Sequence, residues 1–489
     1  MKESINDLAL AAQPWCEEMS TPIHIQAIRQ GVPYRSVDTL ATTGAIVSQV
    51  NSGLIRRDLL AISRATAELE AVPTLQLLAI CKKAGELFLQ GTLPVGDDNR
   101  EQTAPEYVRQ VSASCGLPHV LVRNNMGKIA LVLSDMATIL KGLTRGLDPT
   151  VIDSGMGKQQ GVPVSFYRTT DSLGVVLPSN SPGVNSLWIP SIALKVPVVL
   201  KPGRDDPWTP YRIIQALYAA GCPRSALSFY PTSHEGAHAL LAIAGRSQLF
   251  GDASITKRYA GDSRVELHGP GYSKVLIGAD KSAHWEKLID VLVASVAANG
   301  GRSCVNASAI VVHSHGQEIA AALAERLATI VPRDAEDAKA GLAGFANPVM
   351  AQSINDTIDK ALQEPGAEDV SARFRSGPRL VEHQGRTFLQ PTVIHCQSFD
   401  HPLANREFLF PYCAVVEVPQ DQMLSKIGPS LVVSAIGDDP VWRRRLLASP
   451  LIHRLNLGAM ATSHVHWDQP HEGNLFEFLY RRRAVQTAG

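Results

Sequence analysis

The sequence predicts an α/β fold with two doubly wound parallel-sheet domains and a small separate strand element. Two stretches, 171–280 and 281–455, alternate short apolar strands such as VPVVLKP and SAIVVH with segments of helical pattern. Such alternation favours a parallel sheet that is covered by helices. Because the chain has 489 residues, two or three domains are expected rather than one. We therefore expect a ligand site at the carboxyl ends of the strands.

Before the first alternating stretch, the pattern is mostly helical. Between roughly 50 and 150, runs such as TLQLLAICKKAGELFL place apolar residues at i, i+3 and i+4. We assign residues 1–155 to a helical part of the first domain. The segments 156–170 and 476–489 are polar, strand-capable and attached to neither alternating stretch. Such strands often pair between subunits, which predicts a homodimer or homotetramer, although a surface hairpin explains them nearly as well.

Composition excludes several classes of protein. Lys plus Arg equals Asp plus Glu at 46 each, so there is no global electrostatic reason to bind nucleic acid or an anionic membrane. No stretch reaches the roughly 18 apolar residues of a membrane span, and the N-terminus lacks the pattern of a secretory signal. The seven scattered cysteines contain no C-x-x-C pair, which argues against disulfides or structural zinc. We expect a cytoplasmic protein with a small-molecule partner.

The peptide around Cys304 carries the strongest chemical pattern. It reads NGGRSCVNAS, begins at Asn299, and lies between an expected helix and an expected strand. Two glycines and small polar residues would let the backbone approach a ligand while the thiol sits at a turn with free amides nearby. A thiol in that setting can act as a nucleophile. On this pattern alone, however, a buried and inert cysteine is the better supported interpretation.

Three further motifs change that balance. The segments LGVVLPSNSP, VPVVLKPGRDDPWTP and NREFLFP follow one another along the chain, and the Cys304 peptide lies between the last two. Together they resemble the aldehyde dehydrogenase superfamily from Gly174 to the C-terminal region. The resemblance implies a dinucleotide-binding core in 171–280 and a catalytic domain in 281–455. It also implies covalent catalysis, in which Cys304 attacks a carbonyl, hydride passes to or from a nicotinamide, and a thioester forms or is consumed.

The same resemblance implies roles for single residues. Asn180 would donate to the oxyanion beside the backbone N–H of Cys304. Lys201 would bond the adenosine ribose of NAD or NADP, and Glu407 the nicotinamide ribose, although Leu409 and Phe410 replace the usual Phe and Gly of that motif. Taken singly, each could be an ordinary surface, strand-end or turn residue. Their shared order along the chain makes joint coincidence improbable.

Two departures concern the cofactor. Arg204 stands where NAD-preferring relatives often have a Glu, and an Arg suits a 2′-phosphate, so NADPH should be accepted unless this Arg is merely solvated. Further on, Phe250-Gly251-Asp252 replaces a F-T-G-S sequence. Gly251 would still admit the dinucleotide, whereas Asp252 would repel a pyrophosphate that it faced.

A third departure concerns the acyl acceptor. Hydrolytic members carry an E-L-G-G-K motif whose Glu activates water, and here the segment reads VELHGPGYSKVLI. Matched on E-L-x-G, Glu266 is that base. Matched on the following strand, His268 takes the Glu position and GPGYS resembles coenzyme A-acylating enzymes, where no carboxylate deprotonates water and the acyl group passes to a thiol. A His there could itself act as base.

Three functional hypotheses follow. The favoured one is an acyl-CoA reductase or CoA-acylating aldehyde dehydrogenase that uses NAD(P)H. The second is a hydrolytic aldehyde dehydrogenase with Glu266 as base. The third, a family member without activity that serves as a binding or scaffold subunit, is suggested by the altered motifs, but Cys304, Asn180, Lys201 and Glu407 all persist.

Overall fold

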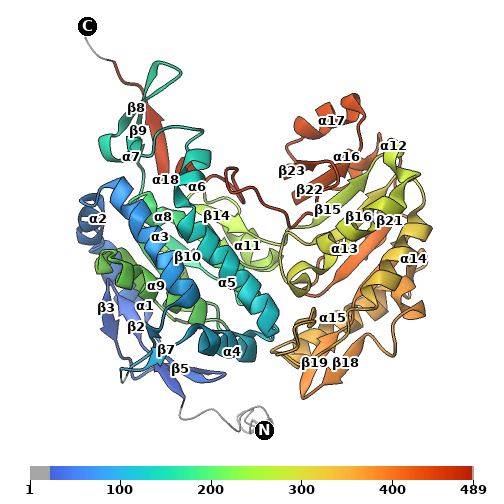
Figure 1. Ribbon diagram of the computed structural model, residues 1–489, viewed down its shortest axis with the longest axis horizontal. Coiled ribbons are helices and arrows are strands. Elements are labelled where there is room, and N and C mark those ends of the chain that lie inside the picture. Colours follow the sequence, from blue (N-terminus) through green and yellow to red (C-terminus); the bar gives the residue numbers. More distant parts are fainter. Residues whose placement is uncertain (1–21, 98, 487–489) are drawn as a thin grey trace.

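The computed structural model describes residues 22–97 and 99–486 and confirms the predicted α/β fold. Figure 1 shows two layered bodies, the first mostly blue to green and the second mostly yellow to red. Each contains a seven-stranded, mostly parallel sheet. Both sheets have helices on their two faces, as the strand and helix alternation predicts.

The first sheet has the strand order β14-β13-β10-β11-β12-β2-β3. β14 to β12 are mutually parallel, whereas β2 and β3 are antiparallel additions at one edge. The bounds are β2 Ala27–Arg29, β3 Val32–Tyr34, β10 Leu173–Val176, β11 Val198–Lys201, β12 Leu227–Phe229, β13 Arg246–Phe250 and β14 Val265–His268. The carboxyl ends of β13 and β14 bring Phe250 level with His268.

The segment 1–155, which we expected to be helical, also contains strands. Among the described residues, 23–48 form β2 and β3 and a small sheet of β1 Ile23–Ile25, β4 Thr39–Thr42 and β5 Ala45–Ser48. β2 and β3 are joined by Gln30 and Gly31, both with positive φ, which is the backbone of a tight hairpin turn. A later hairpin pairs β6 Leu93–Pro94 with β7 Glu101–Gln102. Strands this short leave too little alternation to detect in the sequence.

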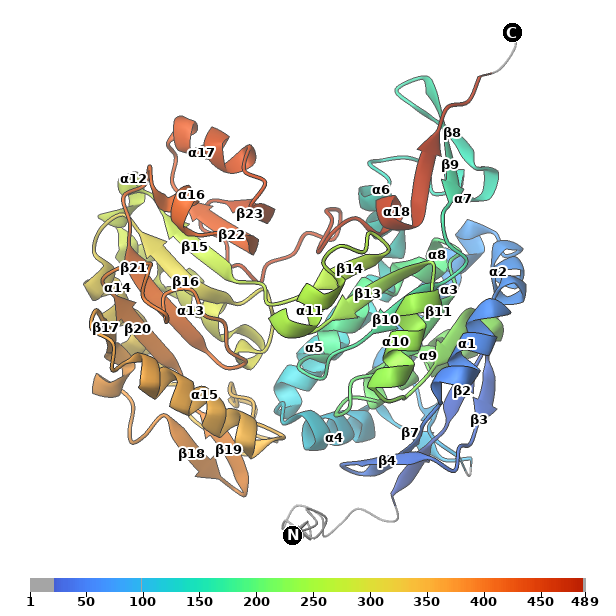
Figure 2. The same ribbon diagram turned by 180° about the vertical axis from the view of Figure 1, so that it is seen from behind.

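Helices cover both faces of the first sheet, as Figures 1 and 2 show from opposite sides. Side chains alternate along β10, so that Val175 packs with α3, α5 and α9, and Val176 packs with α1 and α10. The helices are α1 Ser52–Leu60, α2 Ser63–Glu70, α3 Thr74–Gln90, α4 Ala104–Cys115, α5 His119–Ser134, α6 Met136–Leu143, α7 Val151–Ser154, α8 Pro190–Ala193, α9 Trp208–Ala220, α10 His234–Ile243 and α11 Ala253–Tyr259.

The second sheet has the order β17-β20-β21-β16-β15-β22-β23, and all but β17 are parallel. Its strands are β15 Ser273–Ile277, β16 Ala307–Val312, β17 Ala367–Asp369, β20 Thr392–Cys396, β21 Tyr412–Glu417, β22 Ser430–Ile436 and β23 Ile452–Leu457. β15 corrects our boundary at 281, because we had placed this strand in the first domain. All five of its residues are buried and it pairs with β16 and β22, as suits an apolar run in the middle of a parallel sheet.

The helices of the second domain also lie on both faces of their sheet. α13 Ile289–Ala297 and α14 Gly316–Leu327 pack on one face. α15 Pro348–Ala361, α16 Met423–Lys426 and α17 Pro440–Leu447 pack on the other. The short α12 Ala279–Ser282 follows β15, and β18 Leu380–His383 and β19 Arg386–Leu389 form a separate hairpin.

The described parts of the segments 156–170 and 476–489 contain strands that pair with one another within the chain. β8 Met156–Gln159, β9 Val162–Arg168 and β24 Tyr480–Arg483 form an antiparallel sheet in the order β24-β9-β8 (Figure 1). α18 Leu475–Leu479 leads directly into β24. Their predicted pairing between subunits, and with it a dimer or tetramer, stays a prediction.

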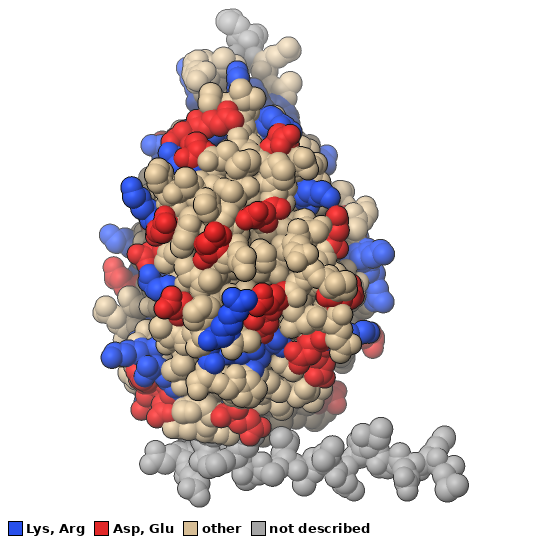
Figure 3. Space-filling view, turned by 90° about the vertical axis from the view of Figure 1, so that its right-hand side faces the viewer, with Lys and Arg blue, Asp and Glu red and all other residues tan. Residues whose placement is uncertain are grey.

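The chain between β23 and α18 returns from the second domain to the first, as the red trace in Figure 2 shows. Asn474 anchors this return segment by donating from Nδ2 to the carbonyl oxygen of Leu143 at 3.0 Å. Among the described residues, no helix is long and apolar enough to cross a membrane. On the face in Figure 3, acidic and basic side chains are interspersed, in agreement with the balanced composition.

Candidate active site

Cys304 lies on a tight turn between α13 and β16. Asn299, Gly300 and Gly301 all have positive φ, which turns the chain sharply before the cysteine. At Gly301 a side chain is also excluded by space, because a Cβ there would lie 2.3 Å from backbone atoms of Phe410 and Pro411. The two glycines therefore form the turn that precedes Cys304, whereas the close approach to a ligand that the sequence predicts for them stays a prediction.

Asn299 ties the Cys304 turn to two elements of the first domain. Its Oδ1 accepts a hydrogen bond from Asn125 Nδ2 of α5 at 2.7 Å. Its Nδ2 lies 3.0 Å from Ser181 Oγ and 3.1 Å from Ser303 Oγ, and donates to both. No sequence motif marks Asn299 as a functional residue. Positive φ is tolerated by asparagine better than by most residues, and the side chain offers both donors and an acceptor.

Cys304 opens onto a cavity of about 320 Å³ between the two domains. The walls come from α5, the loop after β10, the Cys304 turn and the return segment. The lining residues are Leu121, Asn124, Asn125, Lys128, Ser181, Gly183, Val184, Ser186, Leu187, Ala298, Asn299, Ser303, Cys304, Val305, Ser463, His471 and Glu472. The volume is at the lower end of the range of small-molecule sites.

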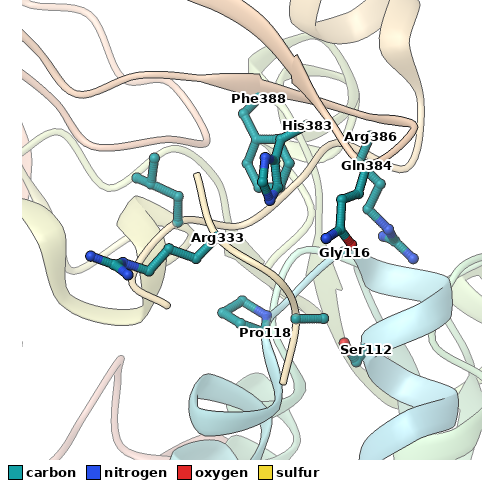
Figure 4. Close-up of a pocket in the computed structure, with 10 residues that line it drawn as sticks. Ser112, Gly116, Pro118, Arg333, His383, Gln384, Arg386 and Phe388 are labelled. Carbon is teal, nitrogen blue, oxygen red and sulfur yellow. The ribbon is translucent and has the colours of Figure 1, made fainter. Parts of the chain in front are cut away.

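A second hollow between the domains is too small for a substrate. It lies between the end of α4 and the β18–β19 hairpin, where Figure 4 shows Ser112, Pro118, Arg333, His383 and Phe388 around it. Its volume is about 20 Å³, which is room for about one water molecule. Cys304 is not among its lining residues.

A buried carboxylate contacts the Cys304 sulfur. Glu472 of the return segment accepts a hydrogen bond from Sγ at Oε1, with a distance of 3.1 Å. Its other oxygen, Oε2, lies 2.7 Å from His268 Nδ1. The Glu472 side chain is only 6% exposed and that of His268 only 4%. Glu472 therefore joins the thiol to an imidazole through its two oxygens.

The charges of these groups follow from burial and contact. Burial, reinforced by the Glu472 carboxylate, holds the pKa of the Cys304 thiol well above its usual value. Burial alone would lower the pKa of His268, but its contacts with Glu266 and Glu472 raise it to about 9. Burial likewise opposes ionisation of Glu472, and His268 outweighs it, so that its pKa falls to about 2. At neutral pH the site holds a thiol, a carboxylate and an imidazolium.

Neither Glu266 nor His268, the two alternatives for the group facing the thiol, makes the hydrogen bond to sulfur. Glu266 accepts from Gln248 Nε2 at 3.0 Å, and its Oε2 lies 3.3 Å from His268 Nε2. His268 also stacks on Phe250, with ring centroids 4.3 Å apart. His268 therefore reaches the thiol only through Glu472, and Glu266 only through His268. Glu472 is a functional candidate that the sequence motifs did not indicate, because it stands alone in an irregular segment.

Asn180 is held next to the Cys304 turn. Its Nδ2 donates to the carbonyl oxygen of Arg302 at 2.8 Å, and its Oδ1 is buried without a hydrogen-bond partner among the described residues. The amide that was expected to serve an oxyanion is thus engaged by backbone two residues before the cysteine. Asn180 therefore lies close to the Cys304 turn, as expected. Donation from Asn180 to an oxyanion stays a prediction.

Glu407 is a second acidic side chain close enough to Cys304 to raise the pKa of the thiol. Its Oε2 accepts from the backbone N–H of Tyr272 at 2.6 Å, and burial raises its pKa to about 7. The neighbouring Lys274 donates to the carbonyl oxygen of Tyr272 at 2.6 Å and to Ser430 Oγ at 3.1 Å, and burial lowers its pKa to about 7. Glu407 is therefore bound to backbone, and its contact with a nicotinamide ribose stays a prediction.

The other predicted cofactor residues lie at the carboxyl ends of strands in the first sheet. Lys201 ends β11, is partly buried, and has a pKa lowered by burial. Arg204 is exposed in the following loop. Gly251 follows β13 and donates from its backbone N–H to the carbonyl oxygen of His268. Asp252 caps α11 by accepting from the backbone N–H groups of Ser254 and Ile255, so its carboxylate already occupies the start of that helix.

No group of three or more metal-ligating side chains occurs within residues 22–97 and 99–486. The six cysteines of that part of the chain are free thiols, and Cys304 is the only one of them that is not fully buried. Burial alone raises the pKa of Cys81 to about 12. Exposure to the cavity therefore separates Cys304 from the other five.

Comparisons with known proteins agree with this geometry. The model of the aldehyde dehydrogenase family matches residues 100–427, which is more than half of the chain. No curated protein matches the sequence. Solved structures similar to the chain include an NAD-dependent benzaldehyde dehydrogenase from Corynebacterium glutamicum, with 17% identity, a TM-score of 0.73, and coverage of 94% of this chain and 98% of that one.

Two further structures are equally distant in sequence. A succinate-semialdehyde dehydrogenase from Burkholderia pseudomallei has 16% identity and a TM-score of 0.74, covering 95% of this chain and 98% of its own. The aldehyde dehydrogenase KauB from Pseudomonas aeruginosa has 15% identity and a TM-score of 0.76, covering 95% and 97%. At such identities the likeness shows the fold, and it extends over nearly the whole chain. The chain belongs to the aldehyde dehydrogenase family, and the protein is an oxidoreductase of that superfamily.

Proposed function

We propose that the protein oxidises a small aldehyde to a carboxylic acid, with Cys304 as nucleophile and NAD⁺ or NADP⁺ as electron acceptor. One observation carries the proposal: the ionised Glu472 carboxylate accepts a hydrogen bond from the Cys304 thiol at 3.1 Å inside the cavity. A carboxylate in that place can take the thiol proton and later a proton of water. Two of the solved relatives are named for free aldehydes as substrates.

The reaction has two halves. As the Cys304 sulfur bonds to the carbonyl carbon, Glu472 accepts the thiol proton and releases it to solvent. Hydride acceptance from the resulting thiohemiacetal is the chemistry that a bound NAD(P)⁺ supplies, and it leaves a thioester on Cys304. Glu472 then accepts a proton from the water that attacks the thioester, the carbon–sulfur bond breaks to release the acid, and this proton returns to the Cys304 sulfur. The balance is one aldehyde, one water and one NAD(P)⁺ to one acid, one NAD(P)H and one proton.

Lys201 and Arg204 are the groups of this chain that fit an anionic dinucleotide. Both lie at the carboxyl end of β11, where doubly wound sheets bind such ligands, and neither forms an ion pair among the described residues. Asp252 does not fit a pyrophosphate at the start of α11, because its carboxylate holds the first free amides of that helix. We therefore propose that the adenosine half is held by the β11 side, with Arg204 allowing NADP⁺ as well as NAD⁺.

Transfer of the acyl group to coenzyme A is the second candidate, favoured by the GPGYS segment and by His268 in the Glu position. Its physical premise is that no carboxylate stands beside the thioester. Glu472 fills that place from a different part of the chain, so water is the acceptor that we favour.

The experiment supplies the purified protein with a panel of aldehydes and either NAD⁺ or NADP⁺, without coenzyme A. We expect NAD(P)H and the matching carboxylic acid in equal amounts, measured by absorbance and by NMR. Cys304→Ala should abolish both, whereas Cys222→Ala, a buried thiol just after α9, should retain them. If NAD(P)H forms only when coenzyme A is added, and acyl-CoA is the product, the hydrolytic proposal is wrong.

A further inference from the structure

We infer that the substrate is a short aldehyde with an anionic group, such as a carboxylate, at the far end of its carbon chain, and that Lys128 binds this anion. The inference rests on the proposed function, because it names the substrate class of the same cavity. Three features of the cavity onto which the thiol opens carry it: an unpaired cation, an unpaired buried imidazole, and the volume of the cavity.

Lys128 is an ammonium that lines the cavity without an acidic partner. It lies on α5 and is partly buried. Its Nζ stands 5.6 Å from the centre of the Trp467 ring, and it forms no ion pair or hydrogen bond with the described residues. Burial lowers its pKa. A partly desolvated cation with only an aromatic face beside it gains when an anion replaces the water that it has lost.

The nearest acid cannot serve as that partner, because its two oxygens are already engaged. Glu472 accepts from Cys304 at Oε1 and pairs with His268 at Oε2. Arg454 adds a further cation nearby: its Nη2 donates to the carbonyl oxygen of Thr462 at 2.6 Å, while its Nε and Nη1 are buried without partners. The surroundings of the cavity are thus richer in cations than in free carboxylates, which favours an anionic ligand.

His471 adds a neutral polar group to the cavity from the return segment, next to Glu472. Its side chain is 9% exposed, and neither ring nitrogen has a hydrogen-bond partner among the described residues. The nearest carboxylate oxygen, Glu472 Oε1, is 3.8 Å from Nδ1, which is too far for a hydrogen bond. Burial lowers the pKa of His471 to about 3, so it offers one N–H and one acceptor. An unsatisfied buried imidazole that faces a cavity is suited to a polar ligand atom.

The size and lining of the cavity limit the carbon chain between the two ends. A volume of about 320 Å³ fits a short chain. Leu121, Val184, Leu187 and Val305 also line the cavity, and their apolar side chains suit methylene groups. The geometry therefore combines an aldehyde end at Cys304, a short apolar middle and an anionic end at Lys128.

Kinetics with matched substrates test the charge preference. The wild-type protein, Lys128→Met and the control Lys141→Met, an exposed lysine of α6, are compared on aldehydes with a terminal carboxylate and on their methyl esters. We expect Lys128→Met to lower kcat/KM for the carboxylates by roughly 10- to 100-fold, mainly through KM, which is the usual size of a lost charged hydrogen bond. For the esters the change should stay within about threefold, and Lys141→Met should resemble the wild type.

An equal loss on carboxylates and esters would overturn the inference, because it would place the action of Lys128 on the Cys304 thiolate or on folding. The rate of thiol alkylation against pH separates the first of these, since a lysine that binds only substrate leaves that profile unchanged.

Binding without turnover separates this inference from the proposed function. Titration calorimetry compares dicarboxylates of four to six carbons with monocarboxylates of the same length on wild-type protein and Lys128→Met. We expect the dicarboxylates to bind at least tenfold more tightly, and this advantage to disappear in Lys128→Met. If the preference is present but no aldehyde is oxidised, the proposed function fails and the anion site stands. If neutral aldehydes are oxidised as well as anionic ones and the preference is absent, the anion site fails alone.

Discussion

Glu472 and Glu407 are two buried carboxylates near Cys304, and each has a basic side chain close by. Glu472 is in direct contact with His268 at 2.7 Å and has a pKa of about 2. Glu407 has Lys274 nearby, but burial prevails and its pKa rises to about 7. One carboxylate is therefore fully ionised at neutral pH, and the other is close to half protonated.

The two pKa values differ because His268 hydrogen-bonds to its carboxylate, whereas Lys274 hydrogen-bonds to other groups. Lys274 gives its hydrogen bonds to the carbonyl oxygen of Tyr272 and to Ser430, so its charge reaches Glu407 only through space. His268 gives Nδ1 directly to Glu472. A direct hydrogen bond within a buried site offsets the cost of burying a charge, whereas proximity alone does not. The carboxylate that contacts the nucleophile is thus the one that is fully ionised at neutral pH.

The largest expected effect on kcat comes from replacing the two carboxylates themselves. Glu472→Gln keeps the size of the side chain but removes the proton acceptor, so kcat for aldehyde oxidation should fall by about 10²- to 10⁴-fold. Glu407→Gln resembles the protonated form that Glu407 already populates, and we expect kcat to fall by less than about tenfold. Steady-state kinetics measure both, with the thiol count by Ellman titration as the control for an intact Cys304. Equal losses in the two variants would mean that contact with sulfur does not select the base.

A smaller effect is expected at the partner of Glu472. In His268→Gln, burial is no longer offset by an imidazolium, so the pKa of Glu472 should rise above its usual value. We expect kcat to fall by about 10- to 100-fold at neutral pH, as for other residues that orient a reacting group. A new acid limb should appear between about pH 5 and 7.

Glu266→Gln is the matched control, because it touches His268 but not the thiol. Its loss should be only a few fold, without a new acid limb. A larger loss in Glu266→Gln than in Glu472→Gln would restore Glu266 as the base, the role that the sequence assigned to it in the hydrolytic hypothesis.

The sequence could predict what is encoded locally. The alternation of strands and helices predicts both sheets, and the glycines around Cys304 predict its turn, because both patterns lie within a few residues of one another. The contact of Cys304 with Glu472 spans 168 residues, and a single glutamate in an irregular segment has no local pattern. The predicted domain boundary at 281 was wrong for a related reason. The apolar sequence of β15 predicts a buried strand, but it does not indicate to which of the two sheets the strand belongs.

The smallest expected effect is on the pH dependence of stability, to which His268 and Lys274 should contribute with opposite sign. His268 has a folded pKa of about 9 against 6.5 as its model value, so its stabilisation is complete below pH 6.5 and is lost as pH rises through 9. Lys274 has a folded pKa of about 7 against 10.5, so the unfolded chain binds more protons and stability rises between pH 7 and 10.5. Between pH 7 and 9 the two groups therefore act in opposite directions.

Substitution of each base should reveal these opposed slopes. Over pH 7 to 9, His268→Gln should gain stability relative to the wild type as pH rises, and Lys274→Met should lose it, each by at most about 1.4 kcal/mol per pH unit. Urea unfolding midpoints at three pH values measure the slopes, and the absolute stability of either variant does not enter. Parallel slopes for both variants and the wild type would show that neither base changes its protonation on folding, and the charge difference between Glu472 and Glu407 would then need another cause.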